Sequence, residues 1–328
     1  MDKKSIALVG SFNLADGYLG AAKALRALGH QVDFIPAHLY RNEEKDHVNK
    51  IIEEIRKFES DVVLWWRGET LTPNAMALIR SEVDGMFIMF SWDDPHQWEG
   101  GHFVSGKMQY MDIAFSCCQG SLQTYLDNGC KKAIYCLPGF DPDIHKPEKD
   151  DEYKCDISIV CTNLYDGHQI TRHKHLSRKV LIDSLIRLFP EADIRIYGSE
   201  SFKDLYGSRY RGWVPFNESN KVFYNSKINI DTHIRPDGYL YLNERVGQIL
   251  GSGGLLMIDP VNGVEEIFKV GEECMVLDCN SDDDLKNQIT DILERDDHYD
   301  TVRENGRRKG LEMMTWAVWA NTILNNVS

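Results

Sequence analysis

The residues best suited to chemistry lie in the segment PDGYLYLNERVGQILGSGGLLMIDPVNGVEEIF, residues 236–268. Its pattern predicts an amphipathic helix over 240–250, with glycine-bearing turns on both sides, followed by a buried strand. The first amides of a helix lack partners within the helix and carry partial positive charge. Gly238 has no Cβ, so the backbone there could approach a ligand closely. We therefore expect this helix start to bind an anionic, diphosphate-containing ligand.

A basic stretch lies in the segment CTNLYDGHQITRHKHLSRK, residues 161–179. It forms a local positive region in a chain whose formal net charge is −14. Such a region suits a diphosphate, because arginine and lysine form charge-assisted hydrogen bonds with phosphate oxygens. The alternative is the charged face of an exposed helix, where such runs usually lie. His173 and His175 alone predict no metal site, because no further ligands stand at suitable spacing.

Polar residues also follow a predicted strand in the first half of the chain. The segment FSWDDPHQW places Asp93, Asp94 and His96 at the carboxyl end of that strand. One aspartate could act as a general base or bind hydroxyl groups of a substrate. Aspartate before proline is equally a normal turn signal. We take these three residues as the catalytic candidates.

Ser11, Asn13 and Arg67 follow two other predicted strands of the first half. If these strands are parallel and neighbouring, their carboxyl ends meet at one edge of the sheet, where a second substrate could lie. The two tryptophans that precede Arg67 could instead serve packing alone.

Apolar strand-like runs alternate with amphipathic helical patterns almost throughout, which predicts parallel sheets covered by helices. Strands are expected at 5–10, 31–37, 61–68, 85–92, 113–118 and 133–139, then at 155–162, 192–199, 227–233, 254–259 and 274–278. Helices are expected at 17–28, 45–58, 74–83, 121–128, 174–189, 218–225, 240–250, 263–268, 282–294 and 299–312, with one more in the tail TWAVWANTILNN. The predicted fold class is α/β, with two Rossmann-like, doubly wound parallel-sheet domains.

The segment LPGFDPDIHKPEKDDEYK is rich in Pro, Asp and Lys, which is typical of a linker. We therefore place one domain at residues 1–146, a second at 147–312, and a C-terminal helix at 313–328 that packs back toward the first. Two such domains would face a cleft at the carboxyl ends of their strands, where folds of this kind bind ligands.

The composition, with 42% hydrophobic and 27% charged residues, is that of a globular protein. A net charge of −14 disfavours duplex nucleic acid or an anionic membrane as a partner. The eight cysteines include no C-x-x-C pair, and several lie in apolar runs, which indicates reduced, buried thiols. The N-terminus has no signal-peptide pattern and no apolar run is long enough to span a bilayer, so we expect a cytoplasmic protein.

The region 228–310 resembles the CgeB-like branch of the GT-B glycosyltransferases. That family has a segment of the form G-L-N-x-R-x-F-E-A-L-A-C-G, then P-G-x-E-E-L-F, G-x-E, and a closing helix with N/A-G-R. The matching residues here are Gly238, Asn243, Arg245, Gly253, Gly263, Glu265, Glu266, Phe268, Gly271, Glu272, Gly306 and Arg307. The first half agrees in layout, including WDDP after the fourth predicted strand.

The resemblance implies a glycosyltransferase that moves a sugar from a nucleoside-diphosphate donor, most simply a UDP-linked one, to a glycan, protein or small-molecule acceptor. The donor would bind to the second domain and the acceptor to the first. Helix amides and basic side chains would stabilise the leaving diphosphate, so neither a metal nor a further cofactor is expected.

The resemblance also assigns residues to the two substrates. An arginine near the start of the helix after the first strand of the second domain binds phosphates in the family; Arg178 fits this place best, with Arg172 as the alternative. Trp213 and Val214 would flank the nucleobase, although Trp213 could equally belong to the core. The other donor-binding candidates are Asp237, Gly238, Tyr239, Asn243, Arg245, Gln248, Gly263 and Glu265. Ser11, Asn13 and Arg67 would bind the acceptor.

Gln248 departs from the family pattern, which usually has a glutamate that binds the ribose hydroxyls. An amide can accept and donate a hydrogen bond but carries no charge, so ribose binding would be weakened or retuned. This change leaves open a non-catalytic module that only binds a sugar nucleotide. A two-domain nicotinamide-dependent dehydrogenase is less favoured, because LVGSFNLADGYLG lacks G-x-G-x-x-G and the second predicted strand does not end in an acidic residue.

Overall fold

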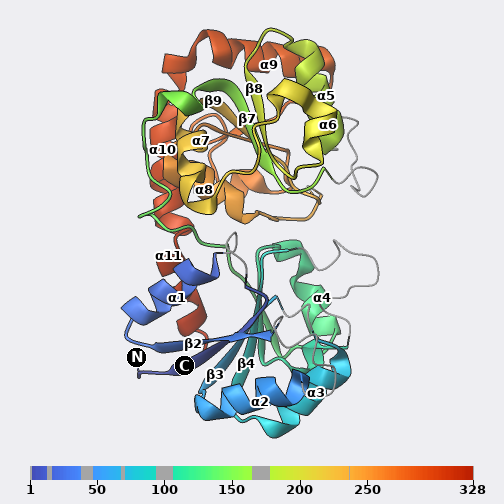
Figure 1. The fold of residues 1–328 in the computed structure, drawn as a ribbon, viewed down its shortest axis with the longest axis vertical. Helices are drawn as coiled ribbons and strands as arrows, with labels where there is room; N and C mark the ends of the chain where they lie inside the picture. The colour runs from blue at the N-terminus through green and yellow to red at the C-terminus, as the bar shows by residue number, and fades with distance from the viewer. Residues whose placement is uncertain are drawn as a thin grey trace. The chain divides into compact units, whose positions relative to one another are not determined.

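The structure, a computed structural model, describes residues 2–12, 17–37, 47–67, 71–93, 106–164, 178–235 and 237–327. The chain divides into two compact units: Met1–Gly139 together with Trp316–Ser328, and Phe140–Thr315. Each unit contains one sheet, and all its strand pairs are parallel (Figure 1). The α/β class predicted from the sequence is confirmed. The observed boundaries lie after residues 139 and 315. The boundaries expected from the sequence lay after residues 146 and 312.

The first unit has a six-stranded sheet in the order β2-β1-β3-β4-β5-β6. Its strands are β1 (Ser5–Gly10), β2 (Gln31–Pro36), β3 (Val62–Trp66), β4 (Met86–Ser91), β5 (Ile113–Ser116) and β6 (Lys132–Tyr135). All five residues of β3 are buried, as expected for a central strand covered on both faces. The helices are α1 (Tyr18–Ala27), α2 (His47–Lys57), α3 (Pro73–Glu82), α4 (Leu122–Asp127) and α11 (Trp316–Leu324).

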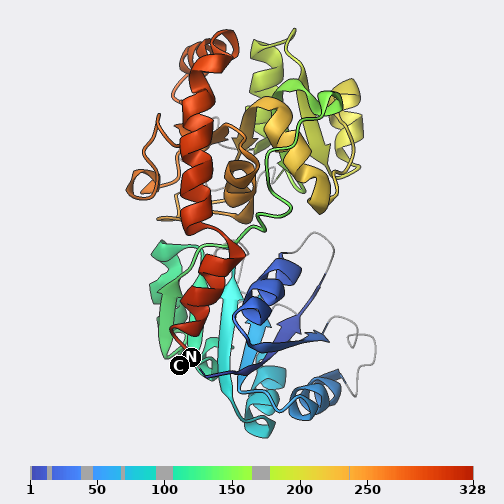
Figure 2. The ribbon, with the colours of Figure 1, turned by 90° about the vertical axis from the view of Figure 1, so that its left-hand side faces the viewer.

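The helix α11 is part of the first unit, although the chain reaches it only after the second (Figure 2). It packs beside α1, where a Cβ on Gly20 would lie 2.3 Å from Cδ1 of Trp316. Trp316 and Trp319 both lie near the ring of Trp66 of β3, with ring centroids 5.8 and 6.0 Å from it. The C-terminal residues therefore complete one face of the first sheet.

The second unit has a five-stranded sheet in the order β11-β10-β9-β7-β8. Its strands are β7 (Cys155–Cys161), β8 (Ile194–Gly198), β9 (Ser226–Asp231), β10 (Leu256–Ile258) and β11 (Met275–Val276). The helices are α5 (Arg178–Leu188), α6 (Phe202–Tyr206), α7 (Ser219–Asn225), α8 (Glu244–Ser252), α9 (Asp282–Glu294) and α10 (Asp300–Met313). The 3-10 turns in the two units are η2 (Met108–Tyr110), η3 (Gln119–Ser121), η4 (Asp151–Tyr153), η5 (Gly207–Arg209), η6 (Phe216–Glu218), η7 (Val264–Glu266) and η8 (Asp296–Tyr299).

The helix α8 is held by close contacts with its neighbours. A Cβ on Gly251 would lie 2.3 Å from a ring carbon of Phe140, and one on Gly310 of α10 would lie 2.9 Å from Cβ of Leu250. A larger side chain at either glycine would push the helices apart, because an interior packed at this density has no room to spare. The close packing at these two glycines therefore fixes the position of α8 against Phe140 and α10.

One predicted helix starts later than expected, and another is only a short turn. The helix expected over 240–250 begins at Glu244, because Asn243 caps it, and the Tyr and Leu residues before it form a buried turn. The helix expected over 263–268 is only the 3-10 turn Val264–Glu266. The helix α6 was not predicted, since its five residues show too little periodicity to be distinguished from a loop.

The segment expected to be a linker is packed against the second unit. Phe140 and His145 within it are both fully buried, and His145 contacts the rings of Phe140 and Phe216 edge-on. All eight cysteines are buried and unbridged, as predicted. Each helix within the described residues is too short or too polar to serve as a membrane span.

The buried His145 predicts a pH dependence of stability. Burial lowers its pKa from 6.5 to about 4. The unfolded chain takes up a proton as the pH falls below 6.5, whereas the native imidazole does so only near pH 4, so stability is lost in that window, by about 3 kcal/mol. We expect His145→Gln to flatten this part of the dependence, measured by urea unfolding at pH 7, 5.5 and 4. The exposed His298, changed to Gln, is the control; equal pH dependence in both variants would contradict the prediction.

Candidate functional site

Polar residues gather where the strands of the second sheet end. Asp231 is the last residue of β9, Thr232 and His233 follow it, and Asp259 follows β10. All four are at most 3% exposed. None of them was a candidate in the sequence, although the runs INIDTH and LLMIDP show polar residues directly after apolar strands. In parallel α/β sheets this edge is where ligands bind.

Arg178, the first residue of α5, is buried within this group, with 5% of its surface exposed. Its Nε donates to the hydroxyl of Thr232 at 2.6 Å, and one terminal nitrogen donates to the Thr232 carbonyl at 2.6 Å. The other terminal nitrogen donates to the carbonyl of Asn163 at 2.5 Å. These bonds tie the ends of β7 and β9 to the start of α5. The guanidinium that was predicted to bind phosphate thus donates its hydrogen bonds to groups of the protein itself, namely the Thr232 hydroxyl and the carbonyls of Thr232 and Asn163.

Arg245, on the first turn of α8, forms an ion pair with Asp231. Its guanidinium lies 2.5 Å from one carboxylate oxygen, and the aspartate side chain is fully buried while that of Arg245 is 21% exposed. The second oxygen of Asp231 has no hydrogen-bond partner among the described residues. Breaking this pair would leave an uncompensated buried charge, which is costly. Asp231 therefore fixes the direction in which Arg245 points.

The start of α8 is capped by its own sequence. The side chain of Asn243 accepts a hydrogen bond from the Arg245 amide at 2.9 Å, and the Asn243 amide donates to Nε2 of His233 at 3.0 Å. These two amides are satisfied within the protein, and the helix begins several residues after Gly238. The expectation of uncompensated helix amides near Tyr239–Tyr241 was therefore wrong.

The turn before α8 contains several of the predicted donor-binding residues. Asp237 accepts two hydrogen bonds from Arg235, at 3.1 Å each. The hydroxyl of Tyr239 donates to the carboxylate of Glu266 at 2.7 Å, and this carboxylate raises the pKa of the phenol. The ring of Tyr239 lies against Gly263, where a Cβ would be 2.6 Å away.

Gln248 and Glu265 lie farther along the same part of the chain. Gln248 is half-buried on α8, and its backbone carbonyl accepts a hydrogen bond from the Ser252 hydroxyl at 2.7 Å. Glu265 is exposed in the 3-10 turn after Gly263, whose φ of 82° is in the left-handed region that favours glycine. Both side chains are thus available to a ligand.

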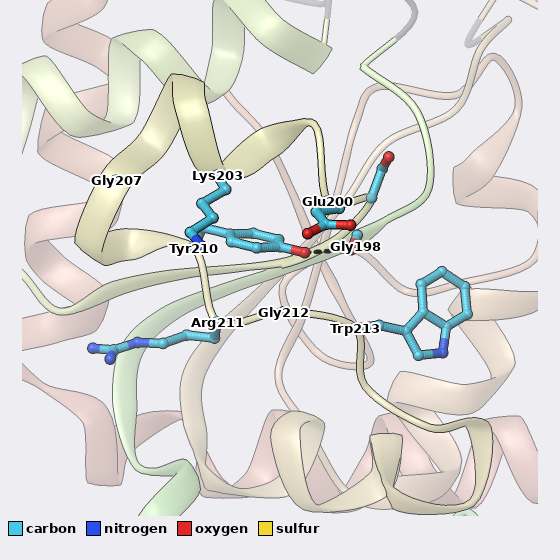
Figure 3. Close-up of a pocket in the computed structure, with 9 residues that line it drawn as sticks. Gly198, Glu200, Lys203, Gly207, Tyr210, Arg211, Gly212 and Trp213 are labelled. Carbon is cyan, nitrogen blue, oxygen red and sulfur yellow. Dashed lines mark hydrogen bonds between the residues drawn. The ribbon is translucent and has the colours of Figure 1, made fainter.

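A hollow of about 640 Å³ opens beside the end of β8 (Figure 3). Trp213 lies at one side of it with 54% of its surface exposed, whereas Val214 is buried. The Gly198 amide donates to the Gly212 carbonyl at 2.9 Å, which ties the turn before Trp213 to the strand. A Cβ on Gly198, whose φ is 151°, would lie 1.8 Å from the Cys161 carbonyl, so no other residue fits there.

The rest of the hollow is polar. It is lined by Ser199, Glu200, Lys203, Tyr210 and Arg211, and the Tyr210 hydroxyl donates to the Gly198 carbonyl at 3.1 Å. The side chain of Arg211 points away from Trp213 (Figure 3). An exposed indole beside polar side chains is suited to the flat face and polar edge of a nucleobase.

The first unit brings two predicted residues together at its own strand ends. Arg67 follows β3 with φ of 69°, an uncommon value for a residue with a side chain. Its guanidinium lies 3.3 Å from the carboxylate of Asp93 and 4.7 Å from the ring centroid of Trp92. Ser11 follows β1 and is half-buried. Backbone strain of this kind is found mostly at functional sites.

Four predicted site residues lie outside the described residues: Asn13, Asp94, His96 and Arg172. Within the described ranges, no group of three or more His, Cys, Asp or Glu side chains is placed to hold a metal ion.

The burial of Arg178 predicts a large effect on stability. Arg178→Met would leave the Thr232 and Asn163 carbonyls without their donor, so we expect the free energy of unfolding to fall by about 3 kcal/mol. The control is Arg187→Met on the same helix. Arg187 is 57% exposed and forms a surface ion pair with Asp282, so its loss should cost less than about 1 kcal/mol. Equal losses in guanidinium unfolding would contradict a structural role for Arg178.

Comparison with known proteins gives a family match over part of the chain and a fold for the whole of it. Residues 172–325 match the family model described as glycosyl transferase-like. No curated protein sequence matches the chain. The match does not distinguish the CgeB-like branch, which stays a prediction.

Solved structures resemble the chain over nearly its whole length. Sucrose-phosphate synthase from Thermosynechococcus elongatus has 13% identity and a TM-score of 0.70, covering 99% of this chain and 98% of that one. Anabaena HepE, solved in complex with UDP-glucose, has 12% identity and a TM-score of 0.72, covering 98% and 99%. A glycosyltransferase from Rickettsia africae has 15% identity and a TM-score of 0.67, covering 100% and 98%. At these identities the likeness shows the fold: the chain has the GT-B fold, and within it residues 172–325 are similar to the glycosyl transferase-like family.

Proposed function

We propose that this protein transfers a sugar from a UDP-linked donor to an acceptor, with the donor bound by the second unit and the acceptor by the first. The observation that carries the proposal is the hollow at the end of β8 with the exposed Trp213 beside it, inside the region that matches the glycosyl transferase-like family. HepE was solved with UDP-glucose, and an α-glucosyltransferase of the same fold was solved with UDP. These complexes favour uridine over other nucleotides.

The nucleobase would lie against the indole of Trp213. This side chain is 54% exposed, so its ring face is accessible to a ligand. Stacking on a base face would bury it. Glu200, Tyr210 and the backbone at Gly212 line the same hollow and would meet the edge of the base.

The diphosphate would lie near Arg245, at the strand ends between the hollow and the turn before α8. Asp231 holds Arg245 in a fixed direction, so less side-chain entropy is lost when an anion binds. Gln248 would bind the ribose hydroxyls and Glu265 the donor sugar, because both side chains are accessible on this part of the chain. Arg178 would act indirectly, by fixing the strand ends around the ligand.

The acceptor would bind where Arg67 and Asp93 meet in the first unit. Transfer breaks the bond between the anomeric carbon and the diphosphate oxygen and forms a bond from that carbon to an acceptor oxygen. The acceptor proton must go to a base, and Asp93 is a carboxylate at a strand end with Arg67 beside it. Neither a metal nor a cofactor enters this proposal, since the leaving diphosphate would be met by cationic side chains.

A second candidate function is binding of a sugar nucleotide without turnover, which is favoured by the glutamine at position 248. Release of UDP from UDP-glucose distinguishes the two functions. Steady release with acceptor or water supports the transferase, whereas binding of UDP-glucose without any release supports the module.

Loss of the indole should weaken nucleotide binding. Stacking of a base on an aromatic side chain contributes about 1–3 kcal/mol, so Trp213→Ala should raise the Kd for UDP by about 5- to 150-fold in isothermal titration calorimetry. Trp213→Phe should recover part of the loss. Tyr224→Ala is the control, since Tyr224 is also exposed, at 40%, on α7 of the same unit. Unchanged affinity in Trp213→Ala would exclude the hollow as the base site.

Loss of the proposed base should slow turnover and spare donor binding. We expect Asp93→Asn to lower the rate of UDP release from UDP-glucose by about 100-fold or more. The Kd for UDP should stay the same, because the donor binds to the other unit. The exposed Asp33 of the first unit, changed to Asn, should leave both quantities unchanged. A parallel loss of UDP affinity in Asp93→Asn would show that Asp93 does not act as proposed.

A further inference from the structure

The connection from β9 to α8 is anchored by a fully buried histidine. His233 lies two residues after β9, and its side chain and that of Asp259 are both 0% exposed. Nδ1 of His233 lies 2.7 Å from one carboxylate oxygen of Asp259, and the other oxygen accepts the His233 amide at 2.7 Å. Asp259 therefore holds both the ring and the backbone of this residue.

The hydrogen bonds assign the tautomer of His233. Its Nε2 accepts a hydrogen bond from the Asn243 amide at 3.0 Å, so this nitrogen carries no proton. The proton must then be on Nδ1, where it is donated to Asp259. A carboxylate can accept hydrogen bonds but cannot donate them. Asp259 therefore selects the tautomer with the proton on Nδ1, and this tautomer leaves Nε2 free to accept the Asn243 amide.

The bond to Asn243 leads directly to Arg245. Asn243 is the cap of α8, and its side chain accepts the Arg245 amide. Arg245 in turn pairs with Asp231 at the end of β9. The ends of β9 and β10 are thus joined to the first turn of α8 through His233.

The turn between His233 and Asn243 is under strain. Leu240 has φ of 50°, in the left-handed region, although its side chain is buried with 4% exposed. Its amide donates to the Asn262 carbonyl at 2.8 Å. A non-glycine residue in this conformation costs on the order of 1 kcal/mol or more and persists only where its surroundings hold it. The bond from His233 to Asn243 is one of the contacts that hold this turn.

We infer that His233, oriented by Asp259, is a positioning residue for the donor site: it holds the cap of α8, and with it Arg245, in place for the nucleotide. This inference rests on the proposed function. A merely structural buried histidine would give stability without affecting the nucleotide. His145, also fully buried in the same unit, provides that comparison because it contacts neither Asn243 nor Arg245.

Three substitutions distinguish the contributions of the individual hydrogen bonds of His233. His233→Asn keeps a donor toward Asp259 but loses the acceptor for the Asn243 amide. His233→Gln places an amide oxygen near the position of Nε2, so it restores that acceptor. In Asp259→Asn an NH2 group, which only donates, replaces one of the two accepting oxygens. The variant must therefore lose either the bond to the His233 amide or the His233 tautomer that binds Asn243. The matched control is His145→Asn.

The test has two readouts, hydrogen exchange of residues 237–250 and the Kd for UDP. We expect His233→Asn and Asp259→Asn to speed exchange in this segment and to raise the Kd by about tenfold. His233→Gln should recover most of the affinity. His145→Asn should lower the melting temperature without changing either readout. Faster exchange with unchanged Kd, or equal loss of affinity in His145→Asn, would overturn the inference.

A measurement on the unchanged protein tests the inference even if the variants fail to fold. Nitrogen chemical shifts of His233 should show a protonated Nδ1 and a bare Nε2; a protonated Nε2 would overturn the inference. If the unchanged protein binds no UDP or UDP-glucose, the proposed function fails and with it the donor-site role, while hydrogen exchange still decides whether His233 holds the turn.

Discussion

Polar side chains at the end of a buried strand must find hydrogen-bond partners inside the protein, and this constraint organises the second unit. The parallel sheet brings Asp231, Thr232, His233 and Asp259 to one edge, where water does not reach them. An unsatisfied buried polar group costs about 1–3 kcal/mol, and an unpaired charge costs more. The starts of α5 and α8 supply the missing partners, so the helices that would surround the nucleotide are positioned by the strand ends themselves.

The helix α8 is also held by packing against α10 and Phe140. The glycines of α8 and α10 allow the two helices to approach closely, and Phe140 fills the space against Gly251. The hydrogen bonds at the front of α8 set the direction of Arg245, while the glycine contacts set the position of the helix axis. A site that must recognise charge at a fixed place needs both, since a misplacement of about 1 Å can cost much of the catalytic rate.

The architecture could be predicted from the sequence, because buried parallel strands and amphipathic helices have different periods. The helix over 282–294 was predicted at its observed bounds, since Ser281 and the aspartates after it give a clear start signal. The start of α8 was misplaced because Tyr239, Leu240 and Tyr241 continue an apolar pattern into the turn. The cap at Asn243 outweighs that pattern.

The site was only partly predictable. Arg245, Arg67 and Asp93 were predicted and lie near strand or helix ends, whereas Trp213 lies in the loop between η5 and η6. The bonds of Arg178 to Thr232 and of His233 to Asp259 were not predicted, because they join residues 54 and 26 positions apart. Nothing in a single sequence pairs such residues; the sheet order does. The polar residues after β9 and β10 could have been marked as site residues, but their partners could not.

The proposed function requires the second unit to bind a uridine nucleotide between the hollow beside Trp213 and the first turn of α8. A crystal structure of the protein with UDP would show whether it does. We expect the uracil ring to stack on the indole of Trp213 and the diphosphate to lie within hydrogen-bond distance of Arg245. Nucleotide bound elsewhere in the molecule, or a hollow that stays empty at saturating UDP, would contradict it.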